Sequence, residues 1–200
     1  METINLEFNT KKQSNIILDT SFHNLLTQWE SIPSGRQVVI VTHPELESNY
    51  ATPLQTLFNE KNIQTHCITI PSGEPHKNMD TVQQLLESFF TLQLERKDTI
   101  IACGGGIVGD MVGFATAIYL RGIHLIQCPT TLLAQVDAAI GGKTAVNHPN
   151  GKNLIGSFYQ PCFTYINTHT LKTLPPHEMR CGMAEIVKYG IIRDPSLFSY

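Results

Sequence analysis

The stretch TIIACGGGIVGD, Thr99 to Asp110, joins a short apolar run to the pattern G-x-G-x-x-G in Gly104, Gly106 and Gly109. Its apolar residues are typical of a strand that is buried on both faces of a sheet. From Val108 onward the residues are typical of a helix, and a glycine-rich turn before a helix lets backbone N–H groups approach a phosphate. The stretch therefore predicts an α/β fold with a phosphate-binding turn at the end of one strand.

Similar apolar runs lie on both sides of this stretch. Residues 38–41 (VVIV), 67–70 (CITI) and 125–128 (LIQC) predict further buried strands, and the apolar spacing within 78–92 predicts a helix between two of them. Strands that alternate with helices in this way form parallel, right-handed sheets. We therefore expect a Rossmann-like, doubly wound and mostly parallel sheet, whose ligands bind beyond the carboxyl ends of its strands.

Composition excludes several classes of partner. The 200-residue chain has a net charge of −3 and no run of like charges, so neither nucleic acid nor an anionic membrane is an expected partner. Its five cysteines form no C-x-x-C pattern, which suits a reducing compartment. No basic and apolar leader opens the sequence and no long apolar segment follows. We expect a soluble, cytoplasmic protein.

The pair Pro175-Pro176 predicts a domain boundary, because prolines interrupt regular structure. Residues 1–174 would form the α/β domain. The pattern of 177–192 is helical, so residues 175–200 would begin a second, helical domain.

The glycine turn differs from an ordinary dinucleotide fingerprint. Such a fingerprint follows the first strand of its unit and has an acidic residue about 20 residues further on. Here a strand and a helix precede it, and the next acid after Asp110 is Asp137. The pattern alone also fits a turn that only packs a helix tightly on a strand.

Basic residues predict an anion site. Between residues 111 and 177, four bases stand against the single acid Asp137. A lysine is ordinarily solvated surface, yet Lys143 (AAIGGKTAV) and Lys152 (NGKNLIG) stand beside glycines among small or apolar residues. We interpret both as ligands of an anion, and leave open whether Asp137 is a buried cap, an ion-pair partner of Lys143 or a site residue.

Glu185 and Lys188, in GMAEIVKYG, lie three residues apart on one helical face. By spacing alone they form a surface ion pair that contributes about 0.2–0.5 kcal/mol. The glycines on either side suggest close packing instead, and a packed carboxylate needs a metal ion or another cation as partner.

Taken together, six motifs closely resemble the 3-dehydroquinate synthase family: SGEPHK (72–77), GGGIVGDMVGF (104–114), YLRG (119–122), PTTLLAQVDAAIGGKTAVNHPNGKNLIGSFYQP (129–161), TLKTLP (170–175) and GMAEIVKYGIIRD (182–194). The resemblance implies a carbon–oxygen lyase of the shikimate pathway that converts 3-deoxy-D-arabino-heptulosonate 7-phosphate to 3-dehydroquinate and releases phosphate. It implies NAD and a divalent metal, zinc or cobalt, as cofactors. Family members are longer, so the chain matches their amino-terminal part.

The resemblance also implies which residues contact NAD. These are Ser72, Gly73, Glu74, Pro75, His76 and Lys77; Gly105, Gly106, Ile107, Val108, Gly109 and Asp110; Thr130 and Thr131; and Thr170, Leu171, Lys172 and Thr173. Lys143 and Lys152 would lie where nicotinamide meets substrate, with Asn153 on the substrate phosphate and Asp137 beside the nicotinamide.

Three further residues take roles from the resemblance. Glu185 matches a metal ligand and Lys188 a substrate-binding lysine. Arg121 matches an arginine that reaches the phosphate across a dimer interface, which implies a homodimer. The family completes its metal site with two histidines from the second domain, and this chain has no histidine after His177.

Three positions depart from the family pattern. Ser72 stands where the family usually has Asp, His76 where it often has Tyr, and His43 where it has Asp or Asn. These departures concern the adenosine side of the NAD site.

Three alternative functions remain open from the sequence. A sister sugar-phosphate cyclase, such as 2-deoxy-scyllo-inosose synthase, would share the glycine turn, the lysines and Glu185. The iron-dependent alcohol dehydrogenases share the two-domain plan but typically read GGGS at the turn and lack both lysines. A non-catalytic NAD-binding fragment is the third alternative.

Overall fold

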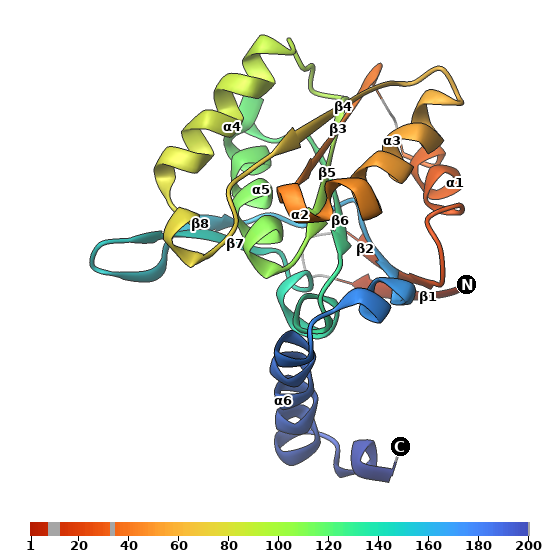
Figure 1. Cartoon of the computed structure of the whole chain (residues 1–200), viewed down its shortest axis with the longest axis vertical. Helices are drawn as coiled ribbons and strands as arrows, with labels where there is room; N and C mark the ends of the chain where they lie inside the picture. The colour runs from red at the N-terminus through yellow and green to blue at the C-terminus, as the bar shows by residue number, and fades with distance from the viewer. Residues whose placement is uncertain (8–12, 33–34, 200) are drawn as a thin grey trace.

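In the computed structural model, residues 1–7, 13–32 and 35–199 are described, and their centre is a seven-stranded sheet (Figure 1). Its strands are β1 (Glu2–Glu7), β2 (Gln13–Asp19), β3 (Gln37–Thr42), β4 (Gln64–Thr69), β5 (Thr99–Gly104), β6 (His124–Pro129) and β9 (Phe163–Asn167). Their order is β1-β2-β9-β6-β5-β3-β4, and only β1 runs antiparallel to its neighbour. The predicted doubly wound, mostly parallel sheet is confirmed, with β1, β2 and β9 as additions.

Helices cover both faces of this sheet. They are α1 (Leu25–Glu30), α2 (Pro44–Leu46), α3 (Thr52–Asn59), α4 (Met79–Thr91), α5 (Gly106–Ile118) and α6 (Pro176–Ile192). Short helical turns connect them: η1 (Glu47–Ala51), η2 (Glu74–His76), η3 (Tyr119–Arg121), η4 (Ala134–Ala138), η5 (Thr168–Thr173) and η6 (Pro195–Ser199). Among the helices of the described residues, none is both long and apolar enough to cross a membrane.

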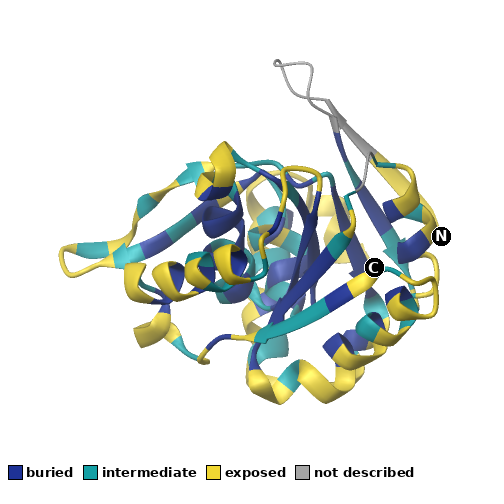
Figure 2. Cartoon of the chain, turned by 90° about the horizontal axis from the view of Figure 1, so that it is seen from above, coloured by how far each residue is buried: buried dark blue, intermediate teal, exposed yellow. Residues whose placement is uncertain are grey.

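Two apolar clusters hold the layers together. Val39 and Val41 of β3 pack with α4 and α5, whereas Val38 and Ile40 of the same strand pack with α1 and α3. Figure 2 shows the strands buried between helices whose outer faces are exposed. Coverage on both faces explains why these strands read as continuous apolar runs.

Local signals set the ends of the two central helices. The Asn78 side chain accepts a hydrogen bond of 3.0 Å from the Thr81 N–H, which caps α4. Helix α5 begins at Gly106, two residues earlier than the helical pattern from Val108 suggests, because Gly105 is already its extended N-cap. The glycine turn between β5 and α5 is therefore very short.

A two-stranded hairpin, β7 (Lys143–His148) and β8 (Gly151–Phe158), lies beside α5 and was not predicted. Close packing joins it to the helix, since a Cβ atom on Gly113 of α5 would lie 2.5 Å from the Thr144 methyl carbon. The hairpin carries both lysines that the sequence singles out.

Helix α6 extends away from the sheet (Figure 1). Within it, only Gly182 and Gly190 are buried. Gly182 lies against the residues just before η4, where an added Cβ would lie 2.5 Å from the Leu132 Cβ. A helix that buries only its glycines has most of its surface available to other contacts.

Candidate functional site

A cavity of about 520 Å³ opens at the carboxyl ends of β3, β4, β5, β6 and β9. All four segments that the resemblance assigns to NAD contribute to its wall, through Ser72, Gly73, Glu74, Gly105, Gly106, Ile107, Thr130, Thr131, Thr170 and Thr173. The remaining residues of those segments, including Lys77, Asp110 and Lys172, do not line this cavity. Parallel sheets bind their ligands at this edge.

The glycine turn carries no side chains and packs closely against its neighbours. A Cβ on Gly105 would lie 3.1 Å from the Thr131 methyl carbon, and one on Gly106 would lie 3.1 Å from the Ala138 Cβ. The first N–H groups of α5 have no partner within the helix, and they face the cavity at the positive end of the helix dipole. A pyrophosphate fits here because backbone N–H groups can approach it without side chains in the way.

Sequence reasoning missed Glu45, which lines the same cavity. The Ser72 hydroxyl lies 2.6 and 2.7 Å from the two Glu45 carboxylate oxygens, and its hydrogen bond lowers the pKa of Glu45. Glu45 follows β3, the strand next to β5, where dinucleotide folds place the carboxylate that binds a ribose. An ordinary fingerprint has this acid after the glycine turn, whereas here the strand that carries it precedes the turn in sequence.

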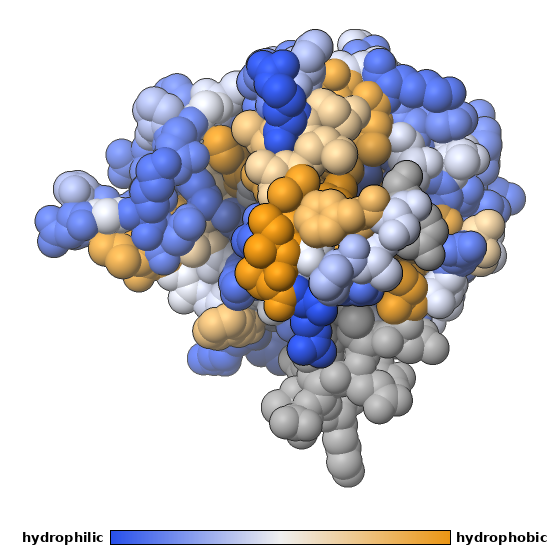
Figure 3. Space-filling model, turned by 90° about the horizontal axis from the view of Figure 1, so that it is seen from below, coloured by the Kyte–Doolittle hydropathy of each residue, from blue (hydrophilic) through white to orange (hydrophobic). Residues whose placement is uncertain are grey.

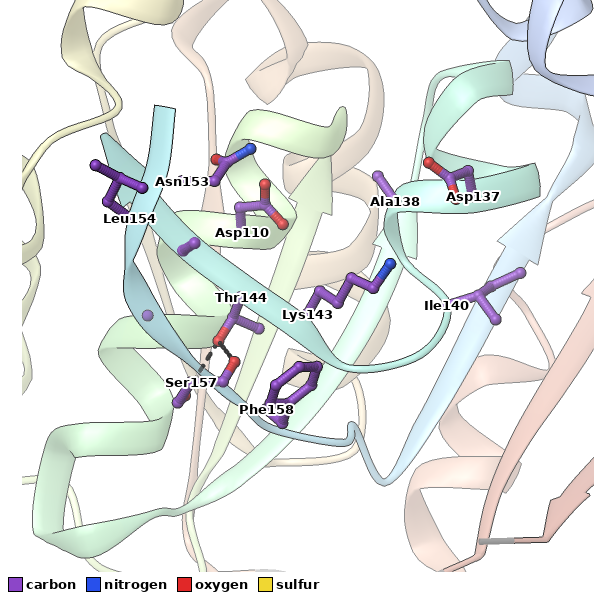
Figure 4. Close-up of a pocket in the computed structure, with 12 residues that line it drawn as sticks. Asp110, Asp137, Ala138, Ile140, Lys143, Thr144, Asn153, Leu154, Ser157 and Phe158 are labelled. Carbon is purple, nitrogen blue, oxygen red and sulfur yellow. Dashed lines mark hydrogen bonds between the residues drawn. The ribbon is translucent and has the colours of Figure 1, made fainter. Parts of the chain in front are cut away.

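A second cavity, of about 550 Å³, lies between η4 and the hairpin (Figure 4). It brings together Asp110, Asp137, Lys143 and Asn153, all of which the sequence analysis names. In Figure 4 the Lys143 amino group points toward Asp137. The two side chains are not among the ion pairs that form between the described residues. Asp137 is exposed and accepts a hydrogen bond of 3.2 Å from the Tyr189 hydroxyl of α6.

Lys77 links the glycine turn to the hairpin. It is 5% exposed, and its Nζ atom donates to Asp110 Oδ2 and Asn153 Oδ1, each at 2.5 Å. Burial raises the pKa of Asp110, and the hydrogen bond from Lys77 opposes that rise. The Lys77 side chain is thus held in a buried ion pair, a contact that the sequence does not suggest.

The two lysines of the hairpin are exposed, contrary to the small or apolar surroundings that the sequence suggests. Lys152 Nζ lies 3.4 Å from Glu74 Oε1. A hydrogen bond from the Asn147 side chain, and then Lys152, lower the pKa of Glu74. Lys143 lines the second cavity, whereas Lys152 lies outside it, beside η2.

The pair Glu185 and Lys188 forms on α6 as the spacing suggests. The hydrogen bond from Lys188 lowers the pKa of Glu185. Among the residues that the structure describes, no three His, Cys, Asp or Glu side chains are grouped so that they could hold a metal ion. The residues present therefore do not complete a metal site.

Arg121 is remote from both cavities. It lies in η3, after the 13 residues of α5, whose amino-terminal end forms the glycine turn. A helix of that length spans about 20 Å. Arg121 is exposed and contributes to neither cavity wall within this chain.

Known proteins resemble this chain in sequence over nearly its whole length. It is 44% identical over 197 residues to the 3-dehydroquinate synthase of Picosynechococcus sp., a match that covers 98% of the chain and 54% of that protein. It is 48% identical to the synthase of Synechococcus sp. over 86% of the chain and 46% of that protein. The chain thus spans about half the length of the curated relatives that it matches.

Solved structures of related enzymes also resemble the chain. A 2-deoxy-scyllo-inosose synthase in complex with carbaglucose-6-phosphate, NAD+ and Co2+ is 29% identical, with a TM-score of 0.87 over 96% of this chain and 52% of that one. A 2-epi-5-epi-valiolone synthase from Streptomyces hygroscopicus with NAD+ and Zn2+ is 27% identical, again with a TM-score of 0.87, over 97% of this chain and 54% of that one. An iron-containing alcohol dehydrogenase, 11% identical at a TM-score of 0.70, shares the fold.

The model of the 3-dehydroquinate synthase amino-terminal domain matches residues 67–181. This range includes the glycine turn, both hairpin lysines and the start of α6. The chain belongs to the 3-dehydroquinate synthase amino-terminal family.

Proposed function

We propose that the chain is the NAD-binding part of a 3-dehydroquinate synthase, which converts 3-deoxy-D-arabino-heptulosonate 7-phosphate to 3-dehydroquinate and phosphate. The observation that carries this proposal is the pair of adjoining cavities at the glycine turn. The first is suited to a dinucleotide, and the second presents Lys143, Asp137 and Asn153 beside it. A dinucleotide cofactor and an anionic substrate need such adjacent sites.

The first cavity would hold NAD along its length. Glu45 and Ser72 would bind the adenosine ribose, because a carboxylate at this strand end accepts hydrogen bonds from ribose hydroxyls. The N–H groups after Gly105 would bind the pyrophosphate. The nicotinamide would then face the second cavity, where the ionisable groups lie; bound NAD supplies the hydride acceptor for a transient oxidation of a substrate hydroxyl.

The second cavity and its rim would bind the sugar phosphate. Lys143 and Lys152 offer positive charge and Asn153 an amide to the phosphate and the hydroxyls. Asp137, which the Tyr189 hydroxyl orients, would accept a hydrogen bond beside the nicotinamide. These residues would bind and orient the substrate, and the positive charge of the two lysines would favour phosphate as the leaving group.

The metal site, the domain division and the homodimer remain proposals. Glu185 would be one ligand of a divalent zinc or cobalt ion, with Lys188 beside it on the substrate; the described residues do not group a full set of ligands around it. Residues 1–174 would form the NAD-binding domain, and residues 175–200 would begin a helical domain. Arg121 would serve the site of a second copy in a homodimer, since it lies about 20 Å from the glycine turn of its own chain.

A sister sugar-phosphate cyclase is the second candidate. The two solved cyclases share the fold at a TM-score of 0.87, and one binds a carba analogue of a hexose 6-phosphate. The 3-dehydroquinate synthases are nevertheless more similar in sequence, at 44% and 48% against 29% and 27%. Assay of a full-length synthase that carries this chain, with the heptulosonate phosphate and with glucose 6-phosphate, separates the two candidates.

The NAD site is tested by calorimetry on this chain. Gly106→Val adds a branched side chain where the pyrophosphate would lie, so we expect NAD binding to weaken about 100-fold or more, as for the loss of about 3 kcal/mol of binding free energy. Gly106→Ala is the matched control with a smaller side chain, whose Cβ would lie 3.1 Å from the Ala138 Cβ. Unchanged NAD affinity in the valine variant would refute this placement of the cofactor.

A further inference from the structure

The hairpin β7–β8 has a packed base and a thinly held tip. Thr144 and Val146 at the base are buried against α5. Beyond them, residues 148–150 and 152–154 are exposed. The position of the tip therefore depends on few contacts, although the tip carries Lys152 and Asn153.

Asn147 makes most of these contacts. Its backbone N–H donates to the Lys77 carbonyl at 2.9 Å, and its side-chain Nδ2 donates to Glu74 Oε1 at 2.9 Å. Its Oδ1 accepts the backbone N–H of Asn153, also at 2.9 Å. One residue thus ties the loop at residues 74–77 to the opposite strand of its own hairpin.

The chemistry of these partners requires an amide. The Glu74 carboxylate only accepts hydrogen bonds, and the Asn153 N–H only donates one. Asparagine satisfies both at once through Nδ2 and Oδ1. Aspartate keeps the acceptor for Asn153 but repels Glu74, and alanine loses both bonds.

A β-bulge lies opposite Asn147. Val146 pairs with Ile155 and His148 with Gly151, so residues 152–154 of β8 all face the single residue Asn147. Within this bulge Asn153 has a φ of 56°, a left-handed conformation that a residue other than glycine adopts at some cost in energy. Bulges redirect side chains beside functional sites, and this one presents Lys152 and Asn153.

We propose that Asn147 is a positioning residue of the anion site: its side chain holds the bulge that carries Lys152 and Asn153 against the Glu74–Lys77 loop. The proposal rests on the proposed function, in which Lys152 and Asn153 bind the substrate phosphate. Asn147 itself does not touch the substrate. It keeps Lys152 and Asn153 in place before the substrate arrives, so that substrate binding does not lose free energy to ordering them.

Amide hydrogen exchange on the chain tests the contact directly. We expect the Asn153 N–H to exchange about tenfold faster in Asn147→Ala, as the loss of one hydrogen bond implies. Asn147→Asp should disturb the tip through repulsion from Glu74. The double variant Asn147→Asp with Glu74→Gln should restore slow exchange, because the new amide at position 74 then donates to the new carboxylate at position 147. Asn150→Ala, an exposed change in the same turn, should leave the Asn153 exchange rate unchanged.

Kinetics of a full-length synthase that carries this chain as its amino-terminal part test the role. Asn147→Ala should raise KM for the sugar phosphate about tenfold and lower kcat less. Unaltered Asn153 exchange in Asn147→Ala, no recovery in the double variant, or an unaltered KM would each overturn the proposal. Normal turnover of Lys152→Ala would instead refute the proposed anion site. If Asn147→Ala does not fold, the recovery in the double variant decides.

Discussion

Helices α5 and α6 both begin at the carboxyl edge of the sheet, yet they are packed very differently. Seven of the 13 residues of α5 are buried, whereas α6 buries two glycines among 17 residues. Met183, Val187 and Ile191 form an apolar row along α6 that stays exposed, with Ile191 70% exposed, and Figure 3 shows apolar side chains gathered at this end. The α5 side of the site is closely packed, whereas the α6 side makes few contacts with the rest of the described residues.

The charged pairs of α5 and α6 also differ in how far they are buried. Asp110 of α5 and Lys77 form a pair in which both side chains are mostly buried. Glu185 and Lys188 of α6 form a pair within one helix, in which the Glu185 side chain is 15% exposed and the Lys188 side chain 49% exposed, against 6% for Lys77. Water stabilises separated charges at an exposed site but is excluded from a buried one. The two pairs should therefore differ sharply in what they contribute to stability.

The largest expected effect concerns turnover. A catalytic zinc usually has three protein ligands, and the α6 side supplies one proposed ligand, Glu185. We expect the 200-residue chain to bind NAD but to release no phosphate above the uncatalysed rate when it is mixed with NAD, zinc or cobalt and the heptulosonate phosphate. A colorimetric assay for phosphate measures this.

A full-length 3-dehydroquinate synthase, assayed in parallel, is the positive control. Enzymatic release of phosphate by the 200-residue chain, abolished by a chelator and by Glu185→Ala, would show that α6 already completes the site.

The next largest effect concerns the buried pair. Lys77→Met leaves the Asp110 carboxylate without its partner, so unfolding by urea at pH 7 should show a loss of about 3–5 kcal/mol. Lys77→Met together with Asp110→Asn removes both charges and should recover much of this loss. A loss below about 1 kcal/mol at pH 7 would mean that water reaches the pair.

The pH dependence of this variant follows from the raised pKa of Asp110. A carboxyl group whose pKa is higher in the folded state favours folding at acid pH, and that contribution disappears as pH rises from about 3.9 through the folded pKa. Loss of Lys77 removes the contact that opposes the rise. The destabilisation of Lys77→Met should therefore grow as pH increases over this range, which urea titrations at several pH values can measure.

Local sequence signals predicted the elements of this fold better than the contacts between them. The apolar runs at 38–41, 67–70, 99–102 and 125–128 lie within β3, β4, β5 and β6, apart from the last residue of the second run. Continuous burial leaves a signal in the run itself. The carboxylate at Glu45 was missed because its partner, Ser72, is 27 residues away and adjacency in a parallel sheet does not follow sequence order.

The candidate site shows the same limit. Glycine spacing and charge pattern identified Gly106, Lys143 and Lys152, which the structure places around two adjoining cavities and their rim. The hairpin was not predicted, because the apolar residues of Lys143 to Phe158 alternate too little to indicate two strands. Its contacts with Lys77 depend on tertiary packing, which residue spacing does not encode.

The two glycines of α6 should respond differently to the same change. A Cβ on Gly182 would meet the Leu132 Cβ at 2.5 Å and the Leu133 backbone nitrogen at 2.7 Å, atoms that cannot move aside easily. Gly182→Ala should therefore cost about 1–3 kcal/mol of stability, less the gain of about 1 kcal/mol in helix propensity. A Cβ on Gly190 would meet the Phe198 ring, which is 59% exposed and can rotate away.

Gly190→Ala should accordingly be neutral or stabilising by up to about 1 kcal/mol. Thermal unfolding of the two variants side by side gives the comparison. Equal effects would contradict the view that Gly182 is where α6 docks on η4.

The smallest expected effect is that of Lys188→Met, which matches Lys77→Met in chemistry but falls on the other helix. Lys188 reaches Glu185 within a single turn of α6, and the remaining Glu185 carboxylate can be hydrated once the lysine is gone. Methionine is as good a helix former as lysine, so propensity does not change. We expect the melting temperature of the chain to stay within measurement error, while Lys77→Met lowers it clearly. A comparable fall in both variants would mean that the α6 pair is as desolvated as the α5 pair, and the contrast between the two helices would then rest on packing alone.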